Sequence, residues 1–169
     1  MDVRFTVRPA VAADAEAVLA LLDDAAAWLL ERGIEQWRPG QWRAESIGSA
    51  IARGETYLMH EQDRAIATIS LQWSDELMWP GAAEDAGYVH RLAVARTHHG
   101  KDIGRILLTW AEWTIAKRPR GFSRLDCACD NPALRRYYEG AGYRYIDDRT
   151  VRGRLGDEFC GSRYEKSLQ

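Results

Sequence analysis

Alternating apolar and polar residues predict β-strands in short runs along the chain. These strands fall at residues 5–9, 56–61, 65–73, 88–94, 125–128, 143–151 and 159–166. Apolar residues spaced three or four apart predict helices instead, most clearly after Asp14, which can cap a helix that Gly33 closes. Further helices are predicted at 42–53, 103–117 and 132–139.

The order of these elements is β, α, α, β, β, β, α, β, α, β, β. This mixed order predicts an α+β fold of the three-layer α/β type, in which helices flank one central, mostly antiparallel sheet. We expect a parallel pair where the helix at 103–117 connects two strands, because parallel neighbours need a crossover. The 169 residues contain no linker-like stretch, so one domain is expected over residues 1–169.

Composition narrows the classes of partner. Twenty-three Lys and Arg stand against 25 Asp and Glu, giving a net charge of −2. That field is too weak to hold nucleic acid or an anionic membrane by bulk electrostatics, so neither is expected as a partner. The longest apolar run, residues 25–30, is too short for a membrane span, and the first residues do not read as a secretion signal.

The cysteines and histidines predict neither a disulfide nor a metal site. Three cysteines cannot all pair with one another, and we expect reduced thiols and a cytoplasmic location. Cys127 and Cys129 are two apart and His98 and His99 are adjacent, which is not the spacing of a zinc site. We therefore expect no metal.

The segment RTHHGKDIGR joins a predicted strand that ends at Val94 to a helix that begins near Ile103. Its backbone N–H groups lie at the positive end of the helix dipole, which favours anions such as a diphosphate. Gly100 and Gly104 allow a sharp turn and close approach of a ligand. Positive charge would come from Arg96, His98, His99, Lys101 and Arg105. The spacing matches neither a P-loop nor a dinucleotide fingerprint, and an ordinary glycine turn is the alternative.

Two blocks of sequence resemble motifs of the GNAT acetyltransferase superfamily. LAVARTHHGKDIGRILL is similar to its acetyl-CoA motif, and NPALRRYYEGAGY is similar to a later motif that contains Asn131, Tyr138 and Gly142. The resemblance implies a central sheet splayed between the fourth and fifth strands, with acetyl-CoA as co-substrate. It implies cofactor contacts from Leu92, Ala93, Val94, His99, Gly100, Lys101, Asp102, Ile103, Gly104, Arg105 and Asn131.

This sequence departs from the family pattern at two positions of the turn. His99 stands where Gln or Arg is usual, and Asp102 stands where glycine is usual. Aspartate tolerates the left-handed backbone conformation, so the turn can still form. Its carboxylate is expected to repel a diphosphate and to weaken cofactor binding unless Lys101 or Arg105 compensates.

The resemblance and the residues together suggest catalytic groups. Tyr138 matches the family tyrosine that protonates the departing thiolate, and Tyr137 is expected in the core. The backbone N–H near Val94 is implied as the oxyanion donor. His90, two residues before Leu92, could take the proton of the amine, although a structural strand histidine is the alternative. Acidic residues of the preceding loop could attract and deprotonate an amine instead: Asp75, Glu76, Glu84 and Asp85.

These observations predict an acetyl-CoA-dependent N-acetyltransferase that acts on a primary amine of a small molecule by direct attack. Five tryptophans could line the acceptor pocket or belong to the core, and they are Trp28, Trp37, Trp42, Trp73 and Trp79. Trp110 and Trp113 are assigned to the core. A protein or peptide N-acetyltransferase, a non-catalytic acyl-CoA sensor and a nucleotide-binding regulator stay open as alternatives. An exposed late strand could support a homodimer.

Overall fold

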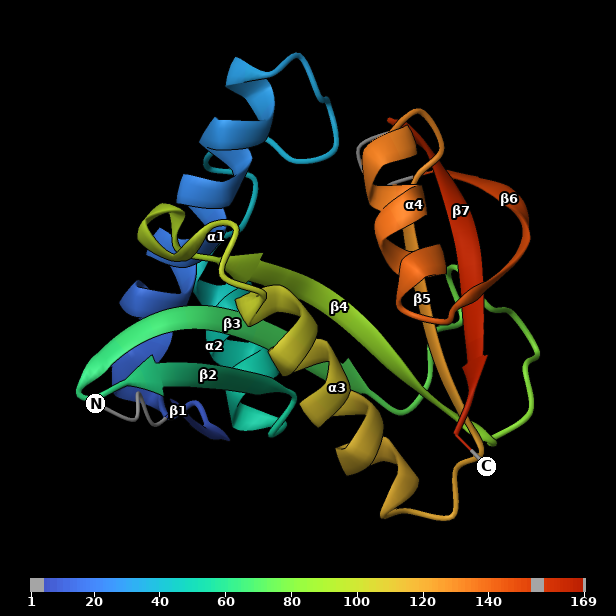
Figure 1. Cartoon of the computed structure of the whole chain (residues 1–169), viewed down its shortest axis with the longest axis horizontal. Coiled ribbons are helices and arrows are strands. Elements are labelled where there is room, and N and C mark those ends of the chain that lie inside the picture. The colour runs from blue at the N-terminus through green and yellow to red at the C-terminus, as the bar shows by residue number, and fades with distance from the viewer. Residues whose placement is uncertain (1–4, 153–156, 169) are drawn as a thin grey trace. The chain divides into compact units, whose positions relative to one another are not determined.

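The computed structural model describes residues 5–152 and 157–168. The elements follow the predicted order, with two short 3-10 turns added. They are β1 (Phe5–Pro9), η1 (Ala12–Asp14), α1 (Ala15–Glu31), α2 (Ala44–Ala52), β2 (Thr56–Glu61), β3 (Arg64–Gln72), β4 (Ala86–Val94), η2 (Arg96–His98), α3 (Ile103–Ala116), β5 (Phe122–Ala128), α4 (Pro132–Gly140), β6 (Arg144–Arg152) and β7 (Glu158–Ser167). They form a seven-stranded sheet in the order β1-β2-β3-β4-β5-β7-β6, which confirms the predicted mixed α+β fold (Figure 1).

Contacts divide the chain into two compact units. The first comprises Met1–Leu71 and Arg91–Thr109, and the second comprises Gln72–His90 and Trp110–Gln169. In the first unit, β1 pairs antiparallel with β2, and β2 with β3. Its core gathers one stripe of α1, the inner face of α2 and residues from the sheet: Ala10, Val18, Leu21, Leu22, Ile47, Ile51, Leu58 and Ala93. Val18, Leu21 and Leu22, which belong to the apolar stripe that predicts α1, therefore lie on the buried side of that helix.

The start of α1 differs from the prediction. Asp14 occupies the N-cap position but its side chain makes no cap hydrogen bond. Instead, its Oδ2 accepts the Val11 N–H at 2.8 Å and is 2.7 Å from Arg8 Nη1. The Asp14 carboxylate therefore stabilises the 3-10 turn that precedes the helix and does not cap the helix itself.

In the second unit, β5 pairs antiparallel with β7 along its whole length, from Phe122↔Ser167 to Ala128↔Gly161, and β7 pairs antiparallel with β6. The pair β4 and β5 is parallel, as the crossover by α3 predicts. Its register covers Ala86–Tyr88 of β4 and Phe122–Arg124 of β5, while both strands continue beyond that ladder within the unit. Among the described residues of this unit, the two strands therefore pair only at their beginning.

The helix α3 crosses β4 closely at one glycine. A Cβ added at Gly87 would lie 2.5 Å from Ile115 Cγ1, so only glycine fits between this point of the strand and the helix. Trp113, which we expected in the core, is 58% exposed. It lies on the solvent side of α3, where Lys117 Nζ is 3.2 Å from its ring centroid. The buried face of α3 is therefore narrower than the sequence predicts, because it does not include Trp113.

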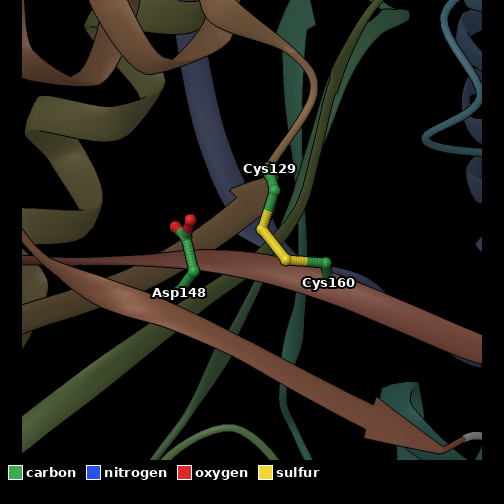
Figure 2. Close-up of side chains that lie close together, drawn as sticks. All are labelled: Cys129, Asp148 and Cys160. Atoms are coloured by element: carbon green, nitrogen blue, oxygen red, sulfur yellow. A yellow bond between two sulfur atoms is a disulfide. The ribbon is translucent and has the colours of Figure 1, made fainter.

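A disulfide joins Cys129 to Cys160, so the expectation of reduced thiols is wrong (Figure 2). Ala128 and Gly161 are the last paired residues of β5 and β7, and the two cysteines are the next residues beyond that pair. The Cys129 N–H also donates to the Cys160 carbonyl at 3.1 Å. Asp148 lies next to the two sulfurs. Because both sulfurs are bonded to each other, they have no thiolate to offer a metal ion. The free cysteine, Cys127, is buried.

The cytoplasmic location was predicted from reduced thiols. Because two of the cysteines form a disulfide, that prediction loses its basis. Among the helices of the described residues, none has the length and the apolar character needed to cross a membrane.

Candidate active site

The predicted phosphate turn contains two left-handed residues directly before a helix. Gly100 has a φ of 75° and Asp102 a φ of 57°, and α3 begins directly after them at Ile103. The Ile106 N–H donates to the Asp102 carbonyl at 2.9 Å, and the Lys101 N–H donates to the His98 carbonyl at 3.3 Å. The amides of Asp102, Ile103 and Gly104 lie in the first turn of the helix, where N–H groups have no intrahelical partner. A Cβ added at Gly100 would meet nothing within 4 Å. The turn is therefore open, and it offers backbone donors at the positive end of a helix.

Two of the basic side chains predicted around this turn are engaged elsewhere. Arg96 Nε is 3.1 Å from Asp24 Oδ1, and Arg96 Nη1 is 3.3 Å from Glu31 Oε2 on α1. His98 is only 5% exposed, with Nε2 3.0 Å from Glu61 Oε2. These pairs fasten the segment before the turn to α1 and β2. The contacts of His99, Lys101 and Arg105 with the cofactor stay predictions.

His99 stacks on α1 rather than projecting alone into solvent. Its ring centroid is 5.1 Å from that of Trp28, and Arg32 lies 4.3 Å from the same tryptophan ring. Trp28 therefore packs against His99 of the turn, and its place in an acceptor pocket stays a prediction.

Asp102 adopts the left-handed conformation expected of the residue that replaces the usual glycine. Changing Asp102 to asparagine keeps a side chain that tolerates this backbone and removes the negative charge. We expect acetyl-CoA to bind about 3- to 10-fold more tightly, because a unit charge several ångströms from a diphosphate costs on the order of 1 kcal/mol in water. Isothermal titration calorimetry at low and high salt measures this effect, which should shrink as salt screens the charge.

Asp63→Asn is the matched control for that change, since Asp63 is an exposed residue in the β2–β3 turn of the same unit. Its variant should bind acetyl-CoA as the unchanged protein does. Equal affinity of the Asp102→Asn variant and the unchanged protein would show that the carboxylate does not face the diphosphate.

The strand β4 contains a residue with left-handed backbone between His90, the predicted base, and the segment from Leu92 to Val94 that is predicted to bind the cofactor. Arg91 has a φ of 51°, which is rare for a long side chain and is often found at functional sites. Burial lowers the pKa of its guanidinium, and its Nη1 atom is buried without a hydrogen-bond partner. The strand alternation is therefore interrupted between His90 and Leu92.

His90 lies in a cluster with two carboxylates. Its Nε2 is 3.2 Å from Asp75 Oδ2, and Asp126 on β5 completes a group whose ligand atoms all lie within 4.8 Å of one another. Burial opposes ionisation of Asp75, but the interactions with His90 and with the Met78 N–H lower its pKa. Burial raises the pKa of Asp126, and the charge of Asp75 adds to this while His90 opposes it.

Two of the other acidic residues of the loop before β4 have structural partners. Asp85 Oδ1 is 2.9 Å from Arg124 Nη1, and Glu76 Oε2 accepts the Gly81 N–H at 3.2 Å. Of the loop carboxylates proposed as alternatives to His90, Asp75 is the one placed beside it. Asp126 was missed by the sequence reading, although a lone carboxylate inside an otherwise apolar strand was a visible signal.

Tyr138 on α4 is buried at 7% exposure, within a group of tyrosine rings. Its ring centroid lies 5.4 Å from Tyr137, 6.0 Å from Tyr143 and 6.3 Å from Tyr164. Burial, with smaller effects from Cys127 and Tyr137, raises the pKa of its phenol well above the usual value. Tyr138 therefore keeps its proton at neutral pH, as a general acid must.

The neighbours of Tyr138 along α4 show two further differences. Tyr137, which we expected in the core, is only half-buried, because the inner face of this short helix is taken by Tyr138. Asn131 Oδ1 accepts the Leu134 N–H at 3.1 Å and caps α4. Its side-chain oxygen therefore has a structural task, and its contact with the cofactor stays a prediction.

The five tryptophans proposed for an acceptor pocket are distributed between both units. Trp37 and Trp42 pack edge-to-face at 5.1 Å against the core of the first unit. Trp79 is 7% exposed and belongs to the core of the second unit, next to Arg163 at 4.7 Å. Arg118 lies 3.9 Å from the ring of Trp73. Trp79 is thus a core residue.

The predicted site residues also divide between the units. The stretch from Leu92 to Arg105 belongs to the first unit, while His90, Asn131 and Tyr138 belong to the second. Within the second unit, the structure brings His90 together with Asp75 and Asp126.

Comparison with known proteins identifies the family. The model of the acetyltransferase (GNAT) family matches residues 22–143. YesJ, an uncharacterized N-acetyltransferase of Bacillus subtilis (strain 168), is 34% identical over 150 residues, which cover 84% of this chain and 83% of that protein.

Solved structures agree with that assignment. A GNAT family acetyltransferase from Listeria monocytogenes 4b F2365 has a TM-score of 0.78 at 26% identity, covering 96% of this chain and 94% of that one. The PaiA N-acetyltransferase of Thermoplasma acidophilum, solved in complex with coenzyme A, has a TM-score of 0.73 at 19% identity, covering 97% and 99%. The family model matches most of the chain, and YesJ is 34% identical to it. The chain therefore belongs to the acetyltransferase (GNAT) family.

Proposed function

We propose that this protein transfers the acetyl group of acetyl-CoA to the primary amine of a small molecule. Family membership supports the acetyl transfer, and the coenzyme A bound to the Thermoplasma protein supports the co-substrate. The observation that carries the proposal is the open turn at Gly100 and Asp102, whose two left-handed residues lead directly into α3. This is the geometry with which a helix start binds a diphosphate.

The residues of the first unit fit the cofactor. The amides of Asp102, Ile103 and Gly104, with the side chain of Lys101, would hold the diphosphate. The backbone from Leu92 to Val94 would make strand-like hydrogen bonds to the pantetheine arm. When bound, acetyl-CoA supplies an acetyl group activated as a thioester.

The proposed reaction moves two protons through side chains of the second unit. The neutral amine attacks the acetyl carbonyl carbon, so that a C–N bond forms and the C–S bond breaks. His90 accepts the proton that the amine nitrogen loses, and Tyr138 donates its proton to the departing sulfur. Cys127 takes no part as a nucleophile, because burial raises the pKa of its thiol to about 12 and keeps it protonated.

Changing His90 to glutamine tests the base. We expect kcat to fall by about 100-fold, since a positioned general base typically contributes that much, while the Kd of acetyl-CoA stays the same. Steady-state kinetics with a thiol-release readout and calorimetry measure the two quantities. His60→Gln on β2 is the control and should leave both unchanged. An unaltered kcat in the His90 variant would assign the proton to another acceptor.

An acetyl-transfer screen tests the function itself. The panel comprises polyamines, aminoglycosides, amino acids and peptides with free N-termini, and released thiol is the readout. Acetylation of small amines supports the proposal, whereas faster acetylation of peptides would identify a protein substrate. Tight acetyl-CoA binding without acetylation of any amine would identify a cofactor-binding module.

A further inference from the structure

Cys129, Cys160 and Asp148 lie together in the second unit (Figure 2). One ligand atom of each residue lies within 4.8 Å of the ligand atoms of the other two. Asp148 belongs to β6, Cys160 belongs to β7, and Cys129 directly follows β5. Once the sulfurs are thiolates, two sulfurs and a carboxylate oxygen are the kind of ligand set that Zn²⁺ prefers.

This cluster is accessible from solvent. Asp148 is exposed, and both cysteines are partly exposed. A reductant and a hydrated metal ion therefore reach the sulfurs, and exposed disulfides are among those that are most readily reduced. Cys127, the free cysteine, is buried and lies outside the cluster. Reduction therefore adds two accessible thiols that differ from the buried one.

Hydrogen bonds orient the Asp148 carboxylate. Its Oδ1 accepts the Ser162 hydroxyl at 2.6 Å, and the Tyr145 hydroxyl is a second hydrogen-bond partner. A carboxylate offers about four acceptor positions, so positions remain for a metal ion. Ser162 lies two residues after Cys160 on β7, which means that one strand supplies a sulfur and also orients the oxygen ligand. Metal-binding carboxylates are typically hydrogen-bonded in this way.

The backbone holds the two cysteines together independently of the disulfide. β5 pairs with β7 along its whole length, and beyond that ladder the Cys129 N–H donates to the Cys160 carbonyl at 3.1 Å. The Cα atoms of the two cysteines are 5.6 Å apart. Two thiolates bound to one Zn²⁺ at about 2.3 Å lie about 3.8 Å from each other, and rotation of the two side chains reaches that separation from these Cα positions.

We propose that the reduced protein binds Zn²⁺ through Cys129, Cys160 and Asp148. A dithiol reductant gives two electrons and two protons to the S–S bond and becomes a disulfide itself, which leaves two thiols on the protein. Zn²⁺ then displaces both thiol protons, forms two Zn–S bonds and binds a carboxylate oxygen, with water as the fourth ligand. The ion joins the same strands as the disulfide, so zinc takes over that cross-link when the cysteines are reduced. This site does not rest on the proposed acetyl transfer.

Titration with Co²⁺ tests the site directly. The protein is reduced with a phosphine, separated from the reductant without oxygen, and titrated with Co²⁺, whose thiolate charge-transfer absorption reports sulfur ligands. The reduced protein should bind one Co²⁺ per chain, and the oxidised protein should show no such absorption. Added Zn²⁺ should remove the absorption by replacing Co²⁺. If the reduced protein lacks the absorption, or if the oxidised protein shows it equally, the proposal fails.

Four variants locate the metal ion. Cys129→Ala/Cys160→Ala should lose the absorption, whereas Cys127→Ala, which removes the buried free thiol, should keep it. Asp148→Asn should weaken Zn²⁺ binding by about 10-fold or more, since even the partners of metal ligands typically contribute that much. Asp157→Asn is its matched control, because Asp157 is an exposed aspartate of the same unit. Metal binding that survives in the double variant, or that is as weak in the control as in Asp148→Asn, would overturn the assignment of these ligands.

Thermal unfolding shows whether zinc replaces the cross-link. A ligand that binds only the folded protein raises its Tm, and Zn²⁺ at about 100 times its Kd should raise the Tm of the reduced protein by roughly 5–10 °C. The oxidised protein and the double variant should not respond. An unchanged or lower Tm of the reduced protein would show that the folded chain does not hold the ion. These measurements need no acetyl transfer, so their result is independent of the amine screen.

Discussion

Replacing Tyr138 by phenylalanine is expected to lower kcat by about 100-fold or more, while the Kd of acetyl-CoA changes by less than about threefold. Phenylalanine preserves the ring, and with it the packing against Tyr137, Tyr143 and Tyr164. The change removes only the hydroxyl that is proposed to protonate the sulfur. Thiol release at saturating substrates measures kcat, and thermal unfolding verifies that the variant is folded.

The pH profile adds a second expectation for Tyr138. Burial raises the pKa of its phenol, so the acid stays protonated through neutral and moderately alkaline pH. Loss of activity on the alkaline side should therefore begin above the usual pKa of tyrosine, about 10. An alkaline limb that begins below this value and disappears in the phenylalanine variant would show a phenol with a lowered pKa, contrary to the buried environment.

Tyr137→Phe is the control, because it changes the adjacent, half-buried tyrosine of the same helix. Its kcat should stay close to that of the unchanged protein. If the two variants lose activity equally, or if Tyr138→Phe keeps its full kcat, the acid is a different group.

Loss of the Cys129–Cys160 disulfide is expected to lower the free energy of unfolding by about 3–4 kcal/mol and the Tm by roughly 10 °C. The cysteines are 31 residues apart, and a cross-link across a loop of this length restricts the unfolded chain substantially. The variant Cys129→Ala/Cys160→Ala and the unchanged protein treated with dithiothreitol should unfold at similar temperatures. Circular dichroism during heating measures both.

Thiol titration in denaturant provides an independent measurement of the cross-link. Of the three cysteines in the sequence, one should react before reduction and all should react after it. Dithiothreitol should leave the Tm of the double variant unchanged. Three reactive thiols in the untreated protein, or a Tm that does not respond to reductant, would contradict the disulfide.

Local pattern was sufficient to predict the elements, and the reason is visible in α1. The spacing of Val18, Leu21 and Leu22 fixes which side of that helix is buried, whatever it packs against. The turn at Gly100 could also be predicted from local sequence, because the glycine lies directly before the residues that begin the next helix. Asp102 has the left-handed backbone expected at this place in the turn, since aspartate tolerates that conformation better than most residues.

The features that the sequence did not predict depend on strand pairing. Cys129 meets Cys160 only because β5 and β7 are neighbours in this register. Asp126 joins Asp75 and His90 because β5 lies beside the start of β4, which no local pattern reveals. Trp113 was misplaced for a related reason, since the width of a buried helix face depends on the surface that the helix covers.

The course of the chain through its two units bears on any attempt at dissection. The chain leaves the first unit after Leu71, returns at Arg91 and leaves it again after Thr109. A fragment truncated at Thr109 would retain residues 86–88 of β4 but lose their β5 partners, Phe122–Arg124. Neither unit can be obtained by truncation at a single position, because residues 72–90 of the second unit interrupt the first one along the chain.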